Sequence, residues 1–395
     1  MTTRAAELRR WEQLRNARLR VFGCAAAILA AGCLRPGGVP EVPVRVLRVP
    51  AGGAVPDALV DAGVIHAVYV RANDVWHVAS PDAGRSWTPP VRVNADPGSV
   101  DEPGMFRGPS LCLGPAGRLH AVWYPLRRDR PASEWGIRYA HLDLAAATPD
   151  PSGSGTRPSG RTWSRPLALS RDPADGSSVA ASEEGAVAVG WVDEDGLRIA
   201  RSTDGGDSFA PPESVPGADP VRSCVSRGRF LPGGEFLLLY RDRRDSARRE
   251  SVMAWGRGMT VSDRATLSGR PWPEDACPTT GGWLSVVPGP SSAPAAVAAW
   301  ETGEEISWAG LDARGRLPGA GEVRTHPVGG RWPVVVANAS GHVCVSWKES
   351  ATIQWQVFNW AGAPLGPVRS QASLSPHAHS AVVLPDGSFL LVDAG

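Results

Sequence analysis

The feature that most constrains this chain is a turn motif that occurs twice, with the pattern Ser-x-Asp-x-Gly-x-Ser-aromatic. Its shared positions are Ser80, Asp82, Gly84 and Trp87 in the first copy, and Ser202, Asp204, Gly206 and Phe209 in the second. The aspartate can accept N–H bonds from its own turn, and the glycine can adopt a positive φ at no steric cost. Each copy follows an apolar segment and precedes a proline-marked one. The same turn in the same context predicts a chain built from repeats.

Pairs of short apolar segments, joined by a glycine turn, recur at intervals of roughly fifty residues. The second segments of these pairs are residues 64–69, 119–123, 187–191, 236–240, 295–300, 343–347 and 389–392. Their near-continuous apolar character is typical of strands buried on both faces. Most pairs are followed by a third and a fourth strand. Four antiparallel strands per repeat predict an all-β propeller of seven blades, with six as the alternative count.

The ends of the chain are expected to close this ring. The last repeat has only two strands, and residues 44–49 can supply its outer strand and hide both edges. A chain of 395 residues would ordinarily divide into several domains, but repeats pack on their neighbours. We therefore expect a single propeller domain over residues 44–395. The 45 glycines and 37 prolines also argue against long helices.

The N-terminal residues have the pattern of an export signal. Residues 1–20 are rich in arginine, and residues 21–31 form an apolar run that is too short for a spanning helix. The stretch Ala30-Ala31-Gly32-Cys33 resembles a bacterial lipobox, which implies a diacylated Cys33. An ordinary cleaved signal with an incidental cysteine is the alternative. We predict a lipoprotein-type signal peptide over residues 1–32 and a tether over residues 33–43. The expected location is the cell envelope, on the periplasmic or the surface face.

The net charge bears on possible partners, and the cysteines bear on disulfide bonding. The net charge of +1 gives no strong field for nucleic acid, so no nucleic-acid partner is expected. In an oxidising compartment the remaining cysteines can pair. Cys224 and Cys277 each lie just ahead of an expected inner strand in consecutive repeats, and we predict a disulfide between them. Cys112 and Cys344 lie within apolar strands and are expected to be buried thiols.

The repeated turn resembles the Asp-box, or BNR repeat, of the sialidase-like β-propellers. A closer likeness is to exported bacterial proteins described as exo-α-sialidases. It rests on the stretches Leu239–Asp242, Arg249–Ser251 and Cys277-Pro278. In such propellers the Asp-box turns lie opposite the ligand face. The resemblance therefore implies that Asp82 and Asp204 support turns and do not act as general acids.

The resemblance also implies a site that this sequence matches only in part. Sialidases hold the sugar carboxylate with a cluster of arginines, and Arg107, Arg241 and Arg331 are the candidates here. Their nucleophile is a tyrosine activated by a glutamate. The tyrosines of this chain are Tyr69, Tyr124, Tyr139 and Tyr240, and none lies in the last 155 residues, where the nucleophile belongs. The catalytic residues stay unknown, and a standard sialidase mechanism is disfavoured.

Two loops after second strands are rich in arginine, at residues 126–130 and 241–249. Arg243 and Arg244 lie in the second loop. We expect these loops to create a positive funnel for an anionic glycan. The competing interpretation is that interleaved aspartates neutralise them. His377 and His379 lack further ligands of suitable spacing, so neither a metal nor another cofactor is expected.

The sequence therefore predicts a monomeric, lipid-anchored propeller that recognises carbohydrate or glycoconjugate at the cell envelope. One alternative is a glycoside hydrolase acting on sialic-acid-like sugars. The other is a protein-interaction scaffold without enzymatic activity.

Overall fold

The computed structural model describes residues 42–50, 52–100, 108–125, 135–144, 162–222, 224–243, 249–256, 260–272, 280–288, 294–303, 305–319, 323–326, 329–375 and 377–395. The chain divides into two compact units, Met1–Pro40 and Glu41–Gly395, and all the described residues belong to the second. The predicted signal peptide and nearly all of the predicted tether lie outside the described residues. Within the described part, no helix is both long enough and apolar enough to cross a membrane.

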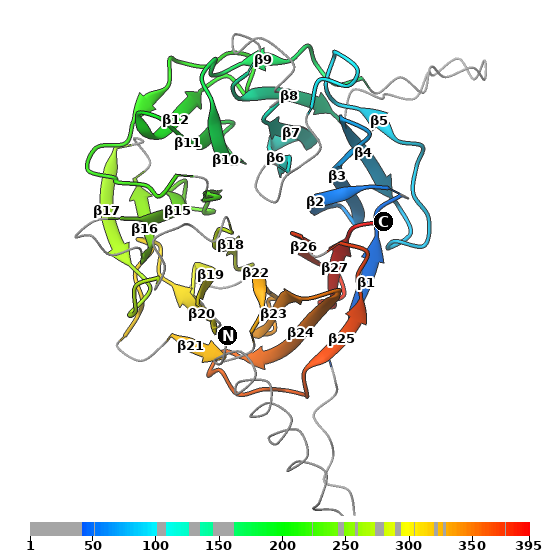
Figure 1. Ribbon diagram of the computed structural model, residues 1–395, viewed down its shortest axis with the longest axis vertical. Coiled ribbons are helices and arrows are strands. Elements are labelled where there is room, and N and C mark those ends of the chain that lie inside the picture. Colours follow the sequence, from blue (N-terminus) through cyan, green and yellow to red (C-terminus); the bar gives the residue numbers. More distant parts are fainter. Residues whose placement is uncertain are drawn as a thin grey trace, which may run out of the picture. The chain divides into compact units, whose positions relative to one another are not determined.

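The second unit is a ring of seven small sheets, which confirms the predicted seven-bladed propeller (Figure 1). The blades are, in order, β2 (Ala54–Asp61), β3 (Val64–Arg71), β4 (Asp74–Ser80) and β5 (Val91–Arg92); β6 (Ser110–Leu113), β7 (Arg118–Trp123), β8 (Arg138–Asp143) and β9 (Leu167–Ala168); β10 (Ala174–Ala181), β11 (Val187–Asp193), β12 (Gly196–Ser202) and β13 (Glu213–Ser214); β14 (Arg227–Phe230), β15 (Phe236–Asp242), β16 (Arg249–Trp255) and β17 (Val261–Thr266); β18 (Trp283–Val286), β19 (Ala296–Thr302), β20 (Glu305–Leu311) and β21 (Arg324–His326); β22 (Arg331–Ala337), β23 (His342–Glu349), β24 (Thr352–Asn359) and β25 (Arg369–Ala372); and finally β26 (Ser380–Val383), β27 (Phe389–Asp393) and β1 (Val44–Arg48).

The seventh blade is closed by the N-terminal strand of the ring. Strand β1 pairs with β27, from Val44 opposite Phe389 to Arg48 opposite Asp393. The pairing is parallel, whereas the other blades are antiparallel throughout. Blade 7 therefore has three strands in the described part, and β1 occupies the third place instead of the fourth place expected for an outer strand. The chain joins the blade beside the start of β27, so both strands run in the same direction.

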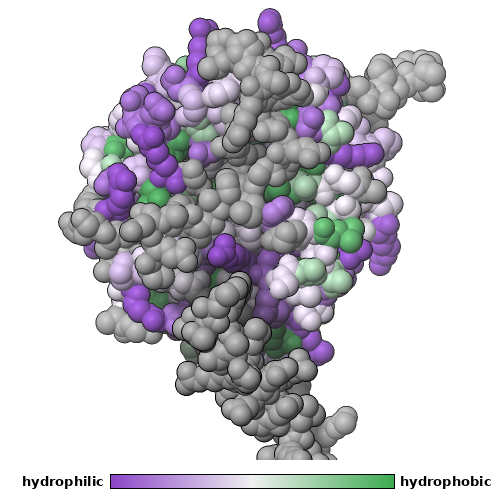
Figure 2. All heavy atoms as spheres, viewed as in Figure 1, coloured by the Kyte–Doolittle hydropathy of each residue, from purple (hydrophilic) through white to green (hydrophobic). Residues whose placement is uncertain are grey.

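The core lies between neighbouring blades, where first and second strands bury both faces. Strand β15 is buried at every position, as its continuous apolar sequence predicts. Tryptophans are packed into the same layers, and Trp123, Trp191, Trp300 and Trp347 lie near the ends of second strands with almost no exposure. Outside this core, Figure 2 shows hydrophilic side chains over much of the visible face, with separate apolar patches among them.

The two repeated turns have the same hydrogen bonds. In the first, the Ser80 hydroxyl donates to Asp82 Oδ1 at 2.8 Å, and the Ser86 hydroxyl donates to Oδ2 at 2.6 Å. The Gly84 N–H donates to the Ser80 hydroxyl at 2.8 Å, with Gly84 at a φ of 88°. Serine donors hold the pKa of the Asp82 carboxyl well below its usual range. Each turn joins the third and fourth strands of a blade, so strand alternation places it at the end opposite the start of the first strand.

The second turn repeats this arrangement with its own residues. The Ser202 and Ser208 hydroxyls donate to the two oxygens of Asp204, at 2.7 and 2.5 Å. These bonds likewise depress the pKa of Asp204. Both oxygens of each carboxylate accept hydrogen bonds inside the turn, so both carboxylates hold backbone geometry.

Candidate functional site

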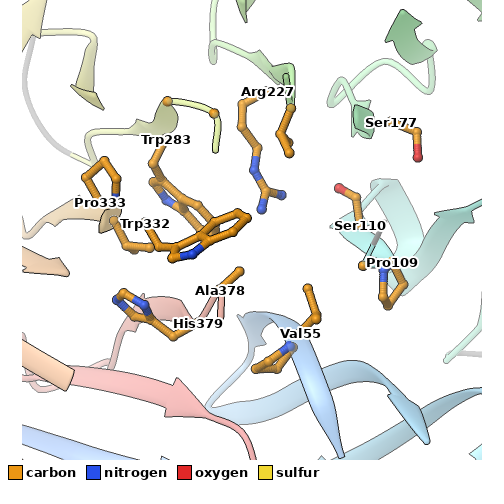
Figure 3. A pocket seen from close by; sticks show the side chains of 16 residues that line it. Val55, Pro109, Ser110, Ser177, Arg227, Trp283, Trp332, Pro333, Ala378 and His379 are labelled. Carbon is orange, nitrogen blue, oxygen red and sulfur yellow. The ribbon is translucent and has the colours of Figure 1, made fainter. Parts of the chain in front are cut away.

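The first strands of all seven blades begin around a central cavity of about 40 Å³ (Figure 3). Each blade contributes to its lining, through Val55, Ser110, Ser177, Arg227, Trp283, Trp332 and His379 in blade order. The lining is mostly apolar and aromatic with a few polar groups, as is usual for small-molecule sites. Its volume corresponds to about three water molecules. A small charged or polar group of a ligand therefore fits inside, while a larger body would remain at the mouth.

Arg227 brings the positive charge of this cavity. Its guanidinium carbon lies 4.0 Å from the centroid of the Trp283 ring, within cation–π range. Its Nη1 donates to Asp57 Oδ2 at 3.1 Å. Asp57 is only 1% exposed and belongs to blade 1, whereas Arg227 belongs to blade 4. The pair therefore spans the centre of the ring and fixes the guanidinium in place.

The sequence analysis did not select Arg227 or Asp57. Both are charged residues within or at the start of a first strand, as are Asp175, Arg229 and Arg331. A charge at a buried position needs a partner of opposite sign. Listing the charged residues of the first strands would have placed Asp57 and Arg227 among the candidates, but the sequence does not say which of them pair.

Trp332 forms another wall of the cavity in an unusual backbone conformation. Its φ is 59°, in the left-handed region that bulky residues rarely adopt. The Trp332 N–H donates to Glu301 Oε2 at 3.2 Å, and the Thr280 hydroxyl donates to Glu301 Oε1 at 2.5 Å. Burial raises the pKa of Glu301, and the Thr280 bond opposes this shift. Strained residues of this kind concentrate at ligand sites, where the surrounding structure holds them.

His379 adds a neutral polar group to the wall. Its Nε2 lies 2.7 Å from the Ser346 hydroxyl, and its Nδ1 has no hydrogen-bond partner among the described residues. Burial, assisted by the charge of Lys348, lowers the pKa of His379 well below its ordinary value. The ring is therefore uncharged at neutral pH and can offer one nitrogen to a bound group.

The described arginines of the sequence prediction do not line the cavity. Arg241 is 2% exposed, and its Nη2 donates to the Glu301 carbonyl at 3.3 Å. Arg331 is exposed and precedes Trp332 in β22. Arg243 is exposed and pairs with Asp219 at 2.9 Å. Arg107 and Arg244 lie outside the described residues, so the ligand role of this set stays a prediction.

Only some of the cysteines for which the sequence makes predictions lie among the described residues. Cys224 is disulfide-bonded, but Cys277 lies outside the described residues, so the pairing stays a prediction. Cys33 also lies outside them. Cys112 and Cys344 are free thiols, and burial raises the pKa of both. Over the described ranges, no group of three or more His, Cys, Asp or Glu side chains is arranged to hold a metal ion.

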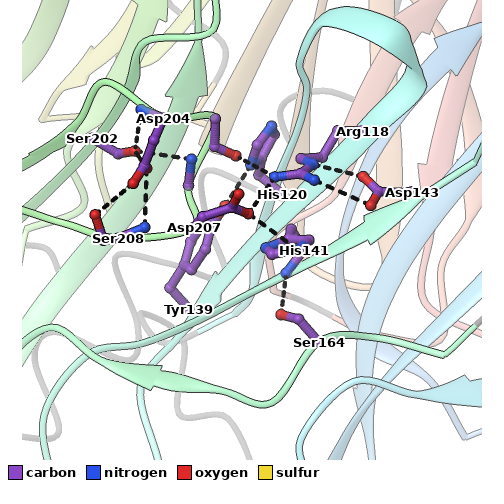
Figure 4. Close-up of polar contacts among 12 residues, drawn as sticks. Arg118, His120, Tyr139, His141, Asp143, Ser164, Ser202, Asp204, Asp207 and Ser208 are labelled. Atoms are coloured by element: carbon purple, nitrogen blue, oxygen red, sulfur yellow. Dashed lines mark hydrogen bonds and ion pairs between the residues drawn. The ribbon is translucent and has the colours of Figure 1, made fainter.

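A second polar cluster lies beside the second repeated turn, Ser202–Phe209, and joins blades 2 and 3 (Figure 4). The Arg118 guanidinium donates to Asp143 and to Asp207, each at 2.6 Å. His120 Nδ1 lies 2.6 Å from the Tyr139 hydroxyl. Burial lowers the pKa of His120 to about 3. Arg118 joins Asp143 of its own blade to Asp207 of the next, so we assign the cluster to the support of the blade interface. His120 Nε2 has no hydrogen-bond partner among the described residues.

Comparisons with known proteins give matches in structure alone. No family model and no curated protein matches the chain. A protein of unknown function from Dyadobacter fermentans is 13% identical, with a TM-score of 0.45 over 89% of this chain and 98% of that one. A leech intramolecular trans-sialidase, complexed with 2,7-anhydro-Neu5Ac, is 10% identical, with a TM-score of 0.45 over 82% and 68%. The α-L-arabinofuranosidase Arb93A of Fusarium graminearum is 12% identical, with a TM-score of 0.43 over 79% and 94%. At these identities the function has to be argued from the residues of the chain itself.

Proposed function

We propose that the central cavity recognises a carbohydrate or glycoconjugate through an anionic group. The observation that carries this proposal is the Arg227 guanidinium, which lines the cavity and stacks on Trp283. A planar guanidinium matches the geometry of a carboxylate. The indole ring of Trp332, which also lines the cavity, offers an aromatic face to the C–H groups of a sugar ring. A carboxylate fits the cavity volume, with the sugar ring packed at its mouth.

Recognition is favoured over hydrolysis by what lines the cavity. Among its described lining residues there is no Tyr, Asp or Glu. Glycoside hydrolysis uses a pair of carboxyl groups, or a tyrosine nucleophile in sialidases. The four tyrosines are packed inside the blades and are at most 3% exposed. The nearby carboxylates of Asp57 and Glu301 accept hydrogen bonds from neighbouring blades.

We expect the double variant Arg227→Met/Asp57→Asn to bind a carboxylated glycoside about 10- to 100-fold more weakly than the parent chain. A hydrogen bond to a charged group contributes about 1.5–3 kcal/mol, which corresponds to that change in affinity. The second substitution avoids leaving Asp57 as an unpaired buried charge. Titration calorimetry with the methyl glycoside of N-acetylneuraminic acid and with its methyl ester measures the effect.

Arg243→Met is the matched control, because Arg243 is exposed and paired with Asp219. Equal binding of the acid and the ester, or unchanged binding by the double variant, would contradict the role of Arg227. Release of the fluorophore from a fluorogenic sialoside would favour the hydrolase alternative. A failure to bind any member of a broad glycan panel would favour the scaffold alternative.

We further propose that the protein is exported and anchored through a lipidated Cys33. The lipobox-like stretch supports this, and the disulfide at Cys224 fits an oxidising compartment. Paired acyl chains anchor a protein stably, unlike a single chain. We expect Cys33→Ser to move the protein from the detergent phase to the aqueous phase in a Triton X-114 partition of expressing bacteria. Equal partition of both proteins would refute the anchor.

A further inference from the structure

Strand β14 carries a second arginine, Arg229, which the proposed function does not use. Side chains alternate along a strand, so Arg227 and Arg229 lie on one face of β14. On the other face Phe230 packs against Phe236, with ring centroids 5.0 Å apart. Arg229 is half-buried and does not belong to the described lining of the central cavity. The first strand of blade 4 therefore carries two neighbouring guanidiniums, of which the cavity uses one.

Groups on other blades act on Arg229 electrostatically. Burial lowers the pKa of its guanidinium, the charge of Asp57 opposes this shift, and the charge of Arg227 adds to it. The Cys112 thiol also acts on it. Asp57 belongs to blade 1, across the ring from blade 4 (Figure 1), and Cys112 belongs to blade 2. Because such effects weaken with distance, the Arg229 side chain is directed toward the centre of the ring.

The protein supplies the Arg229 guanidinium with one hydrogen-bond acceptor. Its Nη1 donates to the Gly228 carbonyl at 2.8 Å. Within the described ranges, Arg229 makes no ion pair, and its Nε and Nη2 donate no hydrogen bond. Most of the N–H donors of this guanidinium therefore remain available to a bound group.

The Asp57 carboxylate is already fully used by other donors. Its Oδ2 accepts from the Leu111 N–H at 3.0 Å and from Arg227 Nη1 at 3.1 Å. Its Oδ1 accepts from the Ala58 N–H at 3.1 Å and from the Ser380 hydroxyl at 3.3 Å. A carboxylate accepts about four hydrogen bonds. Two guanidiniums thus share the field of one saturated carboxylate, and one positive charge is left over.

We propose that Arg229 binds a small monovalent inorganic anion, of which chloride is the type, toward the centre of the ring. A partly buried charge favours a partner of opposite sign. A monovalent ion balances the single excess charge of Arg227, Asp57 and Arg229, whereas a phosphate group carries about 1.5 to 2 negative charges. A small ion also suits a guanidinium that lies outside the described lining of the cavity. The anion site does not depend on whether the cavity binds a glycan.

The test titrates the purified full chain with sodium chloride and follows the line width of the chloride NMR signal, which broadens when the ion exchanges with a protein site. We expect Arg229→Met to bind chloride about 10- to 100-fold more weakly than the parent chain, because charge-assisted hydrogen bonds and the excess charge are both lost. Arg243→Met is the matched control, since Arg243 is exposed and paired with Asp219. It should leave chloride binding unchanged.

Asp57→Asn tests the charge argument in the opposite direction. This variant keeps an oxygen for the Leu111 N–H but leaves two excess positive charges, so it should bind chloride about tenfold more tightly than the parent chain. Chloride binding no tighter than that of the parent chain would contradict the charge balance.

Two results would overturn the anion site itself. The parent chain could cause no broadening beyond that of the buffer, and water alone would then solvate Arg229. Equal broadening by the parent chain and by Arg229→Met would place the chloride on surface arginines. If Arg229→Met does not fold, crystals of the parent chain grown in sodium bromide locate the ion by anomalous scattering. A bromide peak within hydrogen-bond distance of Arg229 is expected, and the absence of a peak there would refute the proposal.

Discussion

Lys348→Met is expected to lower the free energy of unfolding by about 3–5 kcal/mol, the usual cost of removing one partner of a buried ion pair. Lys348 is the single lysine of the chain, and its side chain is 1% exposed. Its Nζ donates to Asp393 Oδ1, to the Ser373 hydroxyl at 2.5 Å and to the Ser375 carbonyl at 3.1 Å. Methionine fills a similar volume, so the cost comes from the Asp393 charge that it leaves buried without a counter-ion.

The position of the ion pair explains why its loss should destabilise the whole propeller. Lys348 lies in the second strand of blade 6, and Asp393 ends β27, the strand that pairs with β1 to close the ring. Urea denaturation followed by tryptophan fluorescence measures the change. Lys348→Met/Asp393→Asn removes both charges and is expected to recover most of the stability. Arg243→Met, at an exposed pair, should cost at most about 1 kcal/mol. A Lys348→Met variant as stable as this control would refute the argument.

The blade pattern was predictable because a strand that is buried on both faces has a continuous apolar sequence. A strand such as β15 has to be apolar at successive positions, and its turn needs glycine where φ is positive. Both features can be read without knowledge of distant contacts. Closure of the ring by residues 44–49 followed from the missing strands of the last repeat. The parallel direction of β1 did not, because it depends on the side from which the chain enters the blade.

The cavity could not be assembled in the same way. Asp57 and Arg227 lie 170 residues apart and meet only because the ring brings blade 1 opposite blade 4 (Figure 1). No local spacing encodes that contact. The resemblance to sialidase-like propellers directed attention to Arg241, which is buried and does not belong to the described lining of this cavity. The left-handed conformation of Trp332 falls in a β-bulge of β22 between Arg331 and Val334. Its N–H donates to the Glu301 carboxylate of the neighbouring blade, a contact that the local sequence does not reveal.

Asp57→Ala is expected to destabilise the fold by about 3–5 kcal/mol, because it leaves buried groups of other blades without an acceptor. Asp57 Oδ2 accepts from the Leu111 N–H at 3.0 Å and from Arg227 at 3.1 Å. Oδ1 accepts from the Ser380 hydroxyl at 3.3 Å. One carboxylate thus joins its own blade to blades 2, 4 and 7. Removal of the carboxylate also removes the hydrogen bond that holds the Arg227 guanidinium at the cavity wall.

Two further variants separate the charge of Asp57 from its hydrogen bonds. Asp57→Asn keeps an oxygen for the Leu111 N–H but loses the charge, so its stability should lie between those of Asp57→Ala and the parent chain. A double-mutant cycle with Arg227→Met measures the coupling of the two residues, which for contacting groups is about 0.5–3 kcal/mol. Urea denaturation supplies all the values. A coupling free energy near zero would mean that the two charges do not depend on each other. It would refute the argument that Asp57 orients the arginine of the cavity.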